Sequence, residues 1–103
     1  MITGNLDGFF QTRGAELGYA LPSDAHVTFE LEGEGGGIWT LVRAKEGVEV
    51  RAGRARWADT VLRCSTNRFE ELVTLRAKLT DALFDGSVRV EGDMGLLVRM
   101  MAA

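Results

Sequence analysis

The sequence predicts an α/β (α+β) fold, with a single five-stranded sheet and helices packed mainly on one of its faces. Two observations indicate it. Apolar residues recur at every second position in the middle of the chain, as in strands with one solvated face, and at every third or fourth position in the segments around it, as in helices. The length of 103 residues suits one domain, expected over 1–103. With 46% apolar and 26% charged residues, such a chain can bury a modest core.

A helix is expected within the first 20 residues, where apolar side chains recur at helical spacing from Leu6 to Leu17. Asn5 and Asp7 are the candidates for its N-cap. Three glycines weaken this helix, since glycine costs about 1 kcal/mol relative to alanine in a helix interior. The segment 21–24 contains the single proline and predicts a loop after the helix.

Four strands are expected next. Segment 27–32 alternates apolar and polar residues, and segments 38–44 and 48–52 follow it after short glycine-containing turns. Short turns of this kind join neighbouring antiparallel strands, so the first three strands should form a meander. A fourth strand is expected over residues 57–64.

The C-terminal part predicts helix, strand and helix. Residues 65–67 offer three candidate N-caps, and Glu70 could complete a capping box from Asn67. An apolar stripe continues through a second helical piece as far as residues 85–86. A fifth strand is expected over 87–91, followed by a last helix over 94–102 that Asp93 can cap.

The last helix is apolar nearly all round, and Arg99 is its one clearly polar position. A helix of this kind must be covered on more than one side. The cover could be the rest of the fold, a partner protein or a ligand, and flexible methionine side chains suit ligands of variable shape. Plain core packing explains the same pattern, so both interpretations stay open.

Charge and cysteine content exclude several classes of protein. A net charge of −3 argues against nucleic acid as a partner, because phosphate binding needs a basic face. The single cysteine excludes an intrachain disulfide and suits a reducing compartment. We find neither the blocks of a secretory signal nor a run of 18 apolar residues, so a cytoplasmic protein is expected. The preference for arginine over lysine hints at a GC-rich bacterial genome.

No residue constellation predicts an enzyme. His26, Asp59 and Ser65 have arbitrary spacings and no nucleophile elbow, so a catalytic triad is not expected. The glycine-rich segment 33–37 feeds a strand rather than a helix, which favours a hairpin turn over a phosphate loop. Cys64 is expected to be a small core residue. One histidine and one cysteine cannot build a usual zinc site, and no metal or cofactor is expected.

Five arginines fall in or beside neighbouring strands and could attract an anionic head group or an acidic membrane surface. They are Arg43, Arg51, Arg54, Arg56 and Arg63. The favoured interpretation is pairing with Glu30, Glu32 and Glu49 on a solvated sheet face.

The order and spacing of five stretches resemble the sterol carrier protein type 2 domain. These stretches are 27–33, 37–41, 58–65, 67–72 and 82–93. The likeness covers residues 25–101, and no single motif in it is specific. Family members commonly have Gly-Lys after the capped helix, whereas this chain has Leu75-Arg76-Ala77-Lys78.

The resemblance implies non-catalytic binding or transfer of a hydrophobic ligand, such as a sterol, a fatty acyl chain or another lipid, in an apolar cavity between sheet and helices. The ligand should reach the cavity by displacement of the last helix. A transient membrane contact, a homodimer or a partner enzyme would fit this family. The expected ligand-binding residues are Phe29, Trp39, Val61, Leu79, Leu83, Phe84, Met94, Leu97, Val98 and Met101. The alternative is an interaction or accessory module that docks through its apolar C-terminal helix and holds no lipid.

Overall fold

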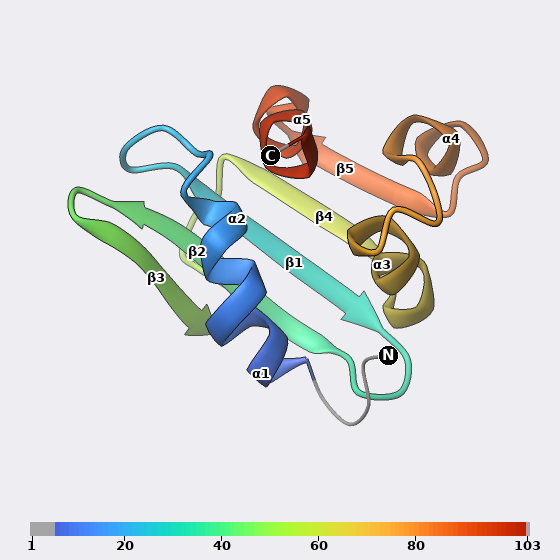
Figure 1. Cartoon of the computed structure of the whole chain (residues 1–103), viewed down its shortest axis with the longest axis horizontal. Coiled ribbons are helices and arrows are strands. Elements are labelled where there is room, and N and C mark those ends of the chain that lie inside the picture. Colours follow the sequence, from blue (N-terminus) through green and yellow to red (C-terminus); the bar gives the residue numbers. More distant parts are fainter. Residues whose placement is uncertain (1–5, 103) are drawn as a thin grey trace.

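One mixed five-stranded sheet forms the centre of the protein, in the order β3-β2-β1-β4-β5 (Figure 1). The computed structural model describes residues 6–102. The strands are β1 His26–Glu32, β2 Gly37–Ala44, β3 Gly47–Ala52, β4 Thr60–Ser65 and β5 Val88–Gly92. The first three strands form the expected antiparallel meander, whereas β4 pairs with β1 in parallel.

The helices cover mainly one face of this sheet, which confirms the predicted architecture (Figure 1). Three short pieces follow one another without a break and form an N-terminal helix over β2 and β3. In the C-terminal half, α3 and α5 contact β4, and α4 lies beside β5. The helices are α1 Asp7–Phe9, η1 Phe10–Gly14, α2 Ala15–Gly18, α3 Thr66–Val73, α4 Leu79–Phe84 and α5 Met94–Ala102.

An aromatic cluster fills the space between the N-terminal helix and the sheet. Phe29 of β1 lies opposite Trp39 of β2, and the ring of Phe10 stacks on Trp39 with centroids 4.8 Å apart. Phe69 of α3 closes the cluster, 5.6 Å from Phe10. The indole nitrogen of Trp39 donates a hydrogen bond of 2.9 Å to Oδ1 of Asp7. This half of the core is therefore packed with aromatic side chains.

The structure corrects the expected cap of the N-terminal helix and selects Ser65 from the three candidates for α3. Leu6 occupies the N-cap position of α1 and makes no side-chain cap, so Asp7 is not the cap; Asn5 lies outside the described residues. In α3 the cap is Ser65, whose Oγ accepts the backbone N–H of Arg68 at 3.0 Å. The capping box from Asn67 is therefore wrong. The cap on α5 is confirmed, because Asp93 accepts from the N–H of Gly95.

The fourth strand begins at Thr60, three residues later than expected. Residues 53–59 instead cross the sheet on the face opposite the helices, because the chain must pass from the edge strand β3 to the far side of β1. Asp59 holds this crossover in place: its N–H donates to the carbonyl of His26, and its Oδ2 accepts the N–H of His26 at 2.8 Å. Trp57 packs on the His26 ring with centroids 4.1 Å apart.

Candidate functional site

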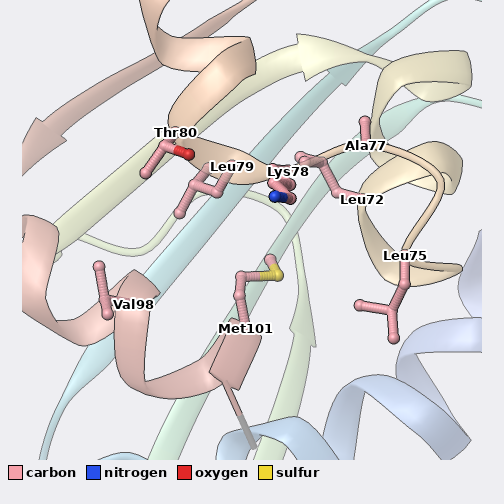
Figure 2. A pocket seen from close by; sticks show the side chains of 8 residues that line it. All are labelled: Leu72, Leu75, Ala77, Lys78, Leu79, Thr80, Val98 and Met101. Carbon is pink, nitrogen blue, oxygen red and sulfur yellow. The ribbon is translucent and has the colours of Figure 1, made fainter.

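An apolar pocket of about 400 Å³ lies between the connection from α3 to α4 and the last helix, α5 (Figure 2). Six of its eight lining residues are apolar, and the other two are a lysine and a threonine. Its volume falls in the range of about 300–1,000 Å³ that is typical of small-molecule sites. The lining residues are Leu72, Leu75, Ala77, Lys78, Leu79, Thr80, Val98 and Met101.

The turn between α3 and α4 forms one wall of the pocket. The α3 helix ends at Val73, and the carbonyl of Glu71 then accepts the N–H groups of both Arg76 and Ala77. Leu75 lies in this turn with a left-handed φ of +62° and a side chain that is 82% exposed. Glycine adopts this conformation without strain, whereas a residue with a Cβ is penalised. The chain thus holds a leucine at the pocket rim in a backbone conformation that favours glycine.

The last helix forms the opposite wall and is covered differently on its two sides. Leu96, Leu97 and Met100 are buried, with 7%, 0% and 0% of their surface exposed. Val98 and Met101 line the pocket instead. This arrangement explains why α5 is apolar nearly all round: the fold covers one side, and the other side faces the pocket.

Lys78 and Thr80 supply the polar groups of the site. In Figure 2 the ammonium nitrogen of Lys78 lies between Leu79 and Leu72, within the ring of labelled side chains. Among residues 6–102, no acidic side chain lines the pocket. An ammonium group and a hydroxyl beside an apolar wall can orient the polar end of an amphipathic molecule, because lysine offers three hydrogen-bond donors and a positive charge.

Three of the ten expected ligand-binding residues line this pocket, namely Leu79, Val98 and Met101. Leu83 is half-buried and packs against the core from α4. Phe84 is 95% exposed, and Met94 is 39% exposed. None of these three residues lines the pocket, although they lie on the same two helices, α4 and α5, as Leu79, Val98 and Met101, and their role in ligand binding stays a prediction.

The other four expected residues lie away from the pocket lining. Phe29, Trp39 and Leu97 belong to the closed core, with 1%, 5% and 0% of their surface exposed. Val61 is paired with Thr28, on the sheet face that the crossover covers rather than on the helical face. Their role in ligand binding stays a prediction.

Five lining residues were missed: Leu72, Leu75, Ala77, Lys78 and Thr80. Four of them lie in or beside the turn at which the sequence departs from the glycine-lysine pattern. An exposed leucine in a turn is the feature that could have indicated them, but only the fold shows that this turn faces α5.

The residues that could suggest catalysis are used structurally: Asp59 binds the backbone of His26, and Ser65 pairs with Glu32 at the other end of β4. Nδ1 of His26 lies 2.8 Å from the carbonyl oxygen of Asp24, and Ser65 caps α3. Cys64 is buried in the core, as expected, and burial raises the pKa of its thiol to about 12. Within residues 6–102 no cluster of three or more His, Cys, Asp or Glu side chains could hold a metal ion, and no helix there is long and apolar enough to cross a membrane.

Three of the five sheet arginines confirm the pairing interpretation, and the first of them, Arg51, contacts Glu49 on the same strand at 2.7 Å. Glu30 of β1 accepts a hydrogen bond from Arg63 of β4 at 2.9 Å and forms an ion pair with Arg54 of the crossover at 2.7 Å. Arg63 also contacts Glu91 of β5 at 2.8 Å. These arginines are therefore engaged with carboxylates on the face opposite the pocket.

Comparison with known proteins identifies relatives of this chain. Residues 13–103 match the profile of the SCP-2 sterol transfer family. Hydroxysteroid dehydrogenase-like protein 2 of Bos taurus is 33% identical over 79 residues, which are 76% of this chain but 19% of that protein. The Homo sapiens protein of the same name is likewise 33% identical over 79 residues, again 76% of this chain and 19% of that one. The chain thus spans about a fifth of these curated relatives.

Solved structures share the fold. Sterol Carrier Protein 2 Like 2 of Aedes aegypti superposes with a TM-score of 0.70 at 14% identity, covering 93% of this chain and 94% of that one. The UbiJ-SCP2 ubiquinone synthesis protein gives 0.67 at 20% identity, with coverages of 88% and 73%. A sec-alkylsulfatase from Pseudomonas sp. gives 0.70 at 17% identity, where 84% of this chain covers 14% of the enzyme.

Proposed function

Because the chain belongs to the SCP-2 sterol transfer family, we propose that it binds a hydrophobic ligand reversibly in the pocket between the α3–α4 turn and α5. The ligand is a lipid with a long apolar part, and the protein carries it without covalent chemistry. The observation that supports this most directly is an open apolar pocket of about 400 Å³ on a fold whose other half is densely packed with aromatic rings.

Burial of apolar surface supplies the affinity. Each methylene removed from water contributes about 0.8 kcal/mol, so roughly ten buried methylenes would contribute about 8 kcal/mol before the costs of ordering the ligand. The lining is predominantly aliphatic, which favours an acyl chain or a ring system without demanding one shape. Lys78 and Thr80 meet the polar end of the ligand at the edge of the pocket.

Among the described residues the lining is predominantly apolar, with Lys78 and Thr80 as its polar side chains, and this composition supports carriage of an apolar molecule. The hydroxysteroid dehydrogenase-like relatives and the alkylsulfatase are several times longer than this chain, so their activities are those of larger proteins. A partner enzyme that delivers or receives the ligand is compatible with this role, and a cytoplasmic location stays a prediction from the sequence.

Titration with a fluorescent long-chain fatty acid tests the proposal. Val98→Gln places an amide in the apolar lining, which costs about 1–3 kcal/mol when the amide finds no partner, so affinity should fall about tenfold or more. Met94→Gln is the matched control, because Met94 lies on the same helix with partial exposure but outside the lining. Leu97 is unsuitable for such a test, because it is completely buried and a polar side chain at this position would unfold the protein.

Equal loss of affinity in both variants, with folding retained by circular dichroism, would contradict this site. Native mass spectrometry of protein purified from its own host would identify the ligand, because a lipid held in the pocket would be retained in the gas phase.

A further inference from the structure

The two edges of the sheet are covered differently. At one edge α4 contacts β5, and Glu91 of β5 is already paired with Arg63 of β4. At the other edge β3 is the outermost strand, and Figure 1 shows no other described element beyond it. The pairing of β3 with β2 runs without a break from Gly47 to Ala52. This strand contains neither proline nor lysine, two residues that commonly protect an exposed edge from pairing with another strand.

The register of β3 on β2 directs a row of backbone groups away from the sheet. Gly53 donates its N–H to the carbonyl of Ile38 at 2.7 Å, so the odd-numbered residues from 47 to 53 direct their backbone groups toward β2. The residues that alternate with them direct their N–H and C=O groups outward, namely Val48, Val50 and Ala52. Among residues 6–102 no backbone hydrogen bond joins these outward groups to another segment. They are therefore available to a further strand.

The side chains of β3 are complementary to those of a second, antiparallel β3. Glu49 and Arg51 lie on the sheet face opposite the helices, each is about half exposed, and Arg51 Nη2 lies 2.7 Å from Glu49 Oε2. In antiparallel pairing centred on Val50, Glu49 of each copy lies opposite Arg51 of the other. These are non-hydrogen-bonded pairs, in which facing side chains come closest. We infer that two copies of this chain dimerise by pairing β3 with β3 in this register, which joins their sheets into one.

Charge selects this register from its neighbours. A slide of two residues in one direction places Glu49 opposite Glu49 of the other copy, and a slide in the other direction places Arg51 opposite Arg51. Like charges directly opposite each other destabilise a strand pair. A slide of one residue would set the outward backbone groups of one copy against residues whose groups point to β2 in the other. Only the register centred on Val50 therefore satisfies both the backbone and the side chains.

The dimer should be weak and reversible. Val50 with its own copy, and Val48 with Ala52 on either side, would exchange about six backbone hydrogen bonds. A single pair of short strands lies at the low end of protein interface sizes, so we expect a dissociation constant of about micromolar or weaker. No residue of β3 lines the pocket, so both pockets stay accessible in such a dimer.

Sedimentation velocity of the full chain, over concentrations up to about 1 mM, tests the inference. The wild-type protein should show a reversible equilibrium between monomer and dimer. Arg51→Glu places glutamates opposite each other in both pairs and should weaken the dimer about tenfold or more. The charge exchange Glu49→Arg/Arg51→Glu brings opposite charges together again, so it should return the dissociation constant to within about threefold of wild type.

The matched control is Arg89→Glu, on the other edge strand. Arg89 is exposed and forms no ion pair with another described residue, so this variant makes the same change of net charge without touching β3. In about 0.15 M salt distant charges are screened, and the dimer should weaken by less than about twofold.

Val50→Pro tests the backbone contact. The N–H of Val50 points away from β2, so proline removes no hydrogen bond of the monomer, whereas it removes the central bonds of the dimer. The variant should keep its circular dichroism spectrum and stay monomeric at concentrations where the wild type is a dimer. If this variant does not fold, the charge variants decide alone, because their side chains are exposed.

Four results would overturn the inference. They are a wild-type protein that stays monomeric throughout the series, a dimer that Arg51→Glu and Arg89→Glu weaken equally, a dimer that the charge exchange does not restore, and a dimer that folded Val50→Pro leaves intact. A dimer that only Arg89→Glu weakens would place the contact at β5 instead.

Discussion

The hydroxyl oxygens of Thr28 and Thr40 lie 2.9 Å apart, directly opposite each other across the β1–β2 pair. Both residues are almost completely buried, with 1% and 0% of their surface exposed, although they lie on the sheet face that carries no helix. Thr40 Oγ1 donates to the carbonyl of Gly53 at 3.0 Å, so the shared proton comes from Thr28. A short chain of hydrogen bonds therefore fixes the start of the crossover to the sheet.

This chain of hydrogen bonds predicts that removing the two hydroxyls has unequal effects on the free energy of unfolding. Thr40→Val leaves both the Thr28 hydroxyl and the Gly53 carbonyl without their partner and should lower the free energy of unfolding by about 1–3 kcal/mol. Thr28→Val leaves the bond from Thr40 to Gly53 intact and should cost less. Urea denaturation of the two variants and the double variant measures this, and a larger cost for Thr28→Val would show that the bonds run differently.

A second prediction concerns the contact between Asp7 and Trp39, which ties the N-terminal helix to β2. Asp7→Ala removes the acceptor of the indole N–H and should destabilise the fold by about 1 kcal/mol. Asp7→Asn keeps an oxygen at the same position and should retain most of the stability. Thermal unfolding followed by Trp fluorescence compares them; equal loss in both would mean that the carboxylate charge, rather than the hydrogen bond, is what matters.

A third prediction follows from Cys64, whose pKa is raised by burial to about 12. The unfolded thiol ionises near its ordinary value of 9.0, so between about pH 9 and pH 12 the unfolded state loses a proton that the folded state keeps. The stability contributed by the neutral buried thiol is thus complete below pH 9 and declines above it, by up to about 1.4 kcal/mol per pH unit. The Cys64→Val variant has no thiol to ionise and so lacks this pH-dependent contribution. The difference in free energy of unfolding between the wild-type protein and the variant should therefore vary with pH in that window. A constant difference from pH 8 upward would contradict the prediction, as would rapid alkylation of the native thiol.

The sequence predicted the sheet better than the site, for a physical reason. Strand residues such as Val27, Phe29 and Leu31 alternate in hydrophobicity because one face of each strand is buried, and that pattern is local. The late start of β4 was missed because the path of 53–59 depends on which sheet face the helices leave free, a property of the whole fold. The pocket depends in the same way on two segments about 20 residues apart in the chain.

The last helix shows how much the hydrophobic pattern of the sequence can predict. Its all-round hydrophobicity predicts cover on more than one side, whereas the fold buries one side and leaves the other facing the pocket. Leu97 and Val98 are adjacent and equally apolar in the sequence. Only the fold assigns Leu97 to the core and Val98 to the pocket. The turn at Leu75 could not be predicted from propensity at all, because leucine rarely adopts a left-handed backbone.

The strain at Leu75 gives a fourth prediction. Leu75→Gly relieves the left-handed conformation, and this gain should offset the extra freedom that glycine has in the unfolded chain. Leu75→Ala keeps the strain and removes the same contacts. The glycine variant should therefore be more stable than the alanine variant by about 1 kcal/mol, measured by chemical denaturation. Equal stability would mean that the turn relaxes around alanine.

The fifth prediction concerns how the ligand reaches the pocket. Displacement of α5 would expose Leu96, Leu97 and Met100, which are almost fully buried. At about 1.5–3 kcal/mol per buried side chain, that exposure would cost roughly 5–9 kcal/mol, close to the whole stability of a small domain. The turn around Leu75 has little to lose, because that side chain is already largely exposed. We therefore expect hydrogen exchange in 96–101 to be equally slow with and without a bound fatty acid, and exchange in 74–78 to slow on binding. Fast exchange of α5 in the free protein that becomes slow on loading would show instead that the last helix itself opens.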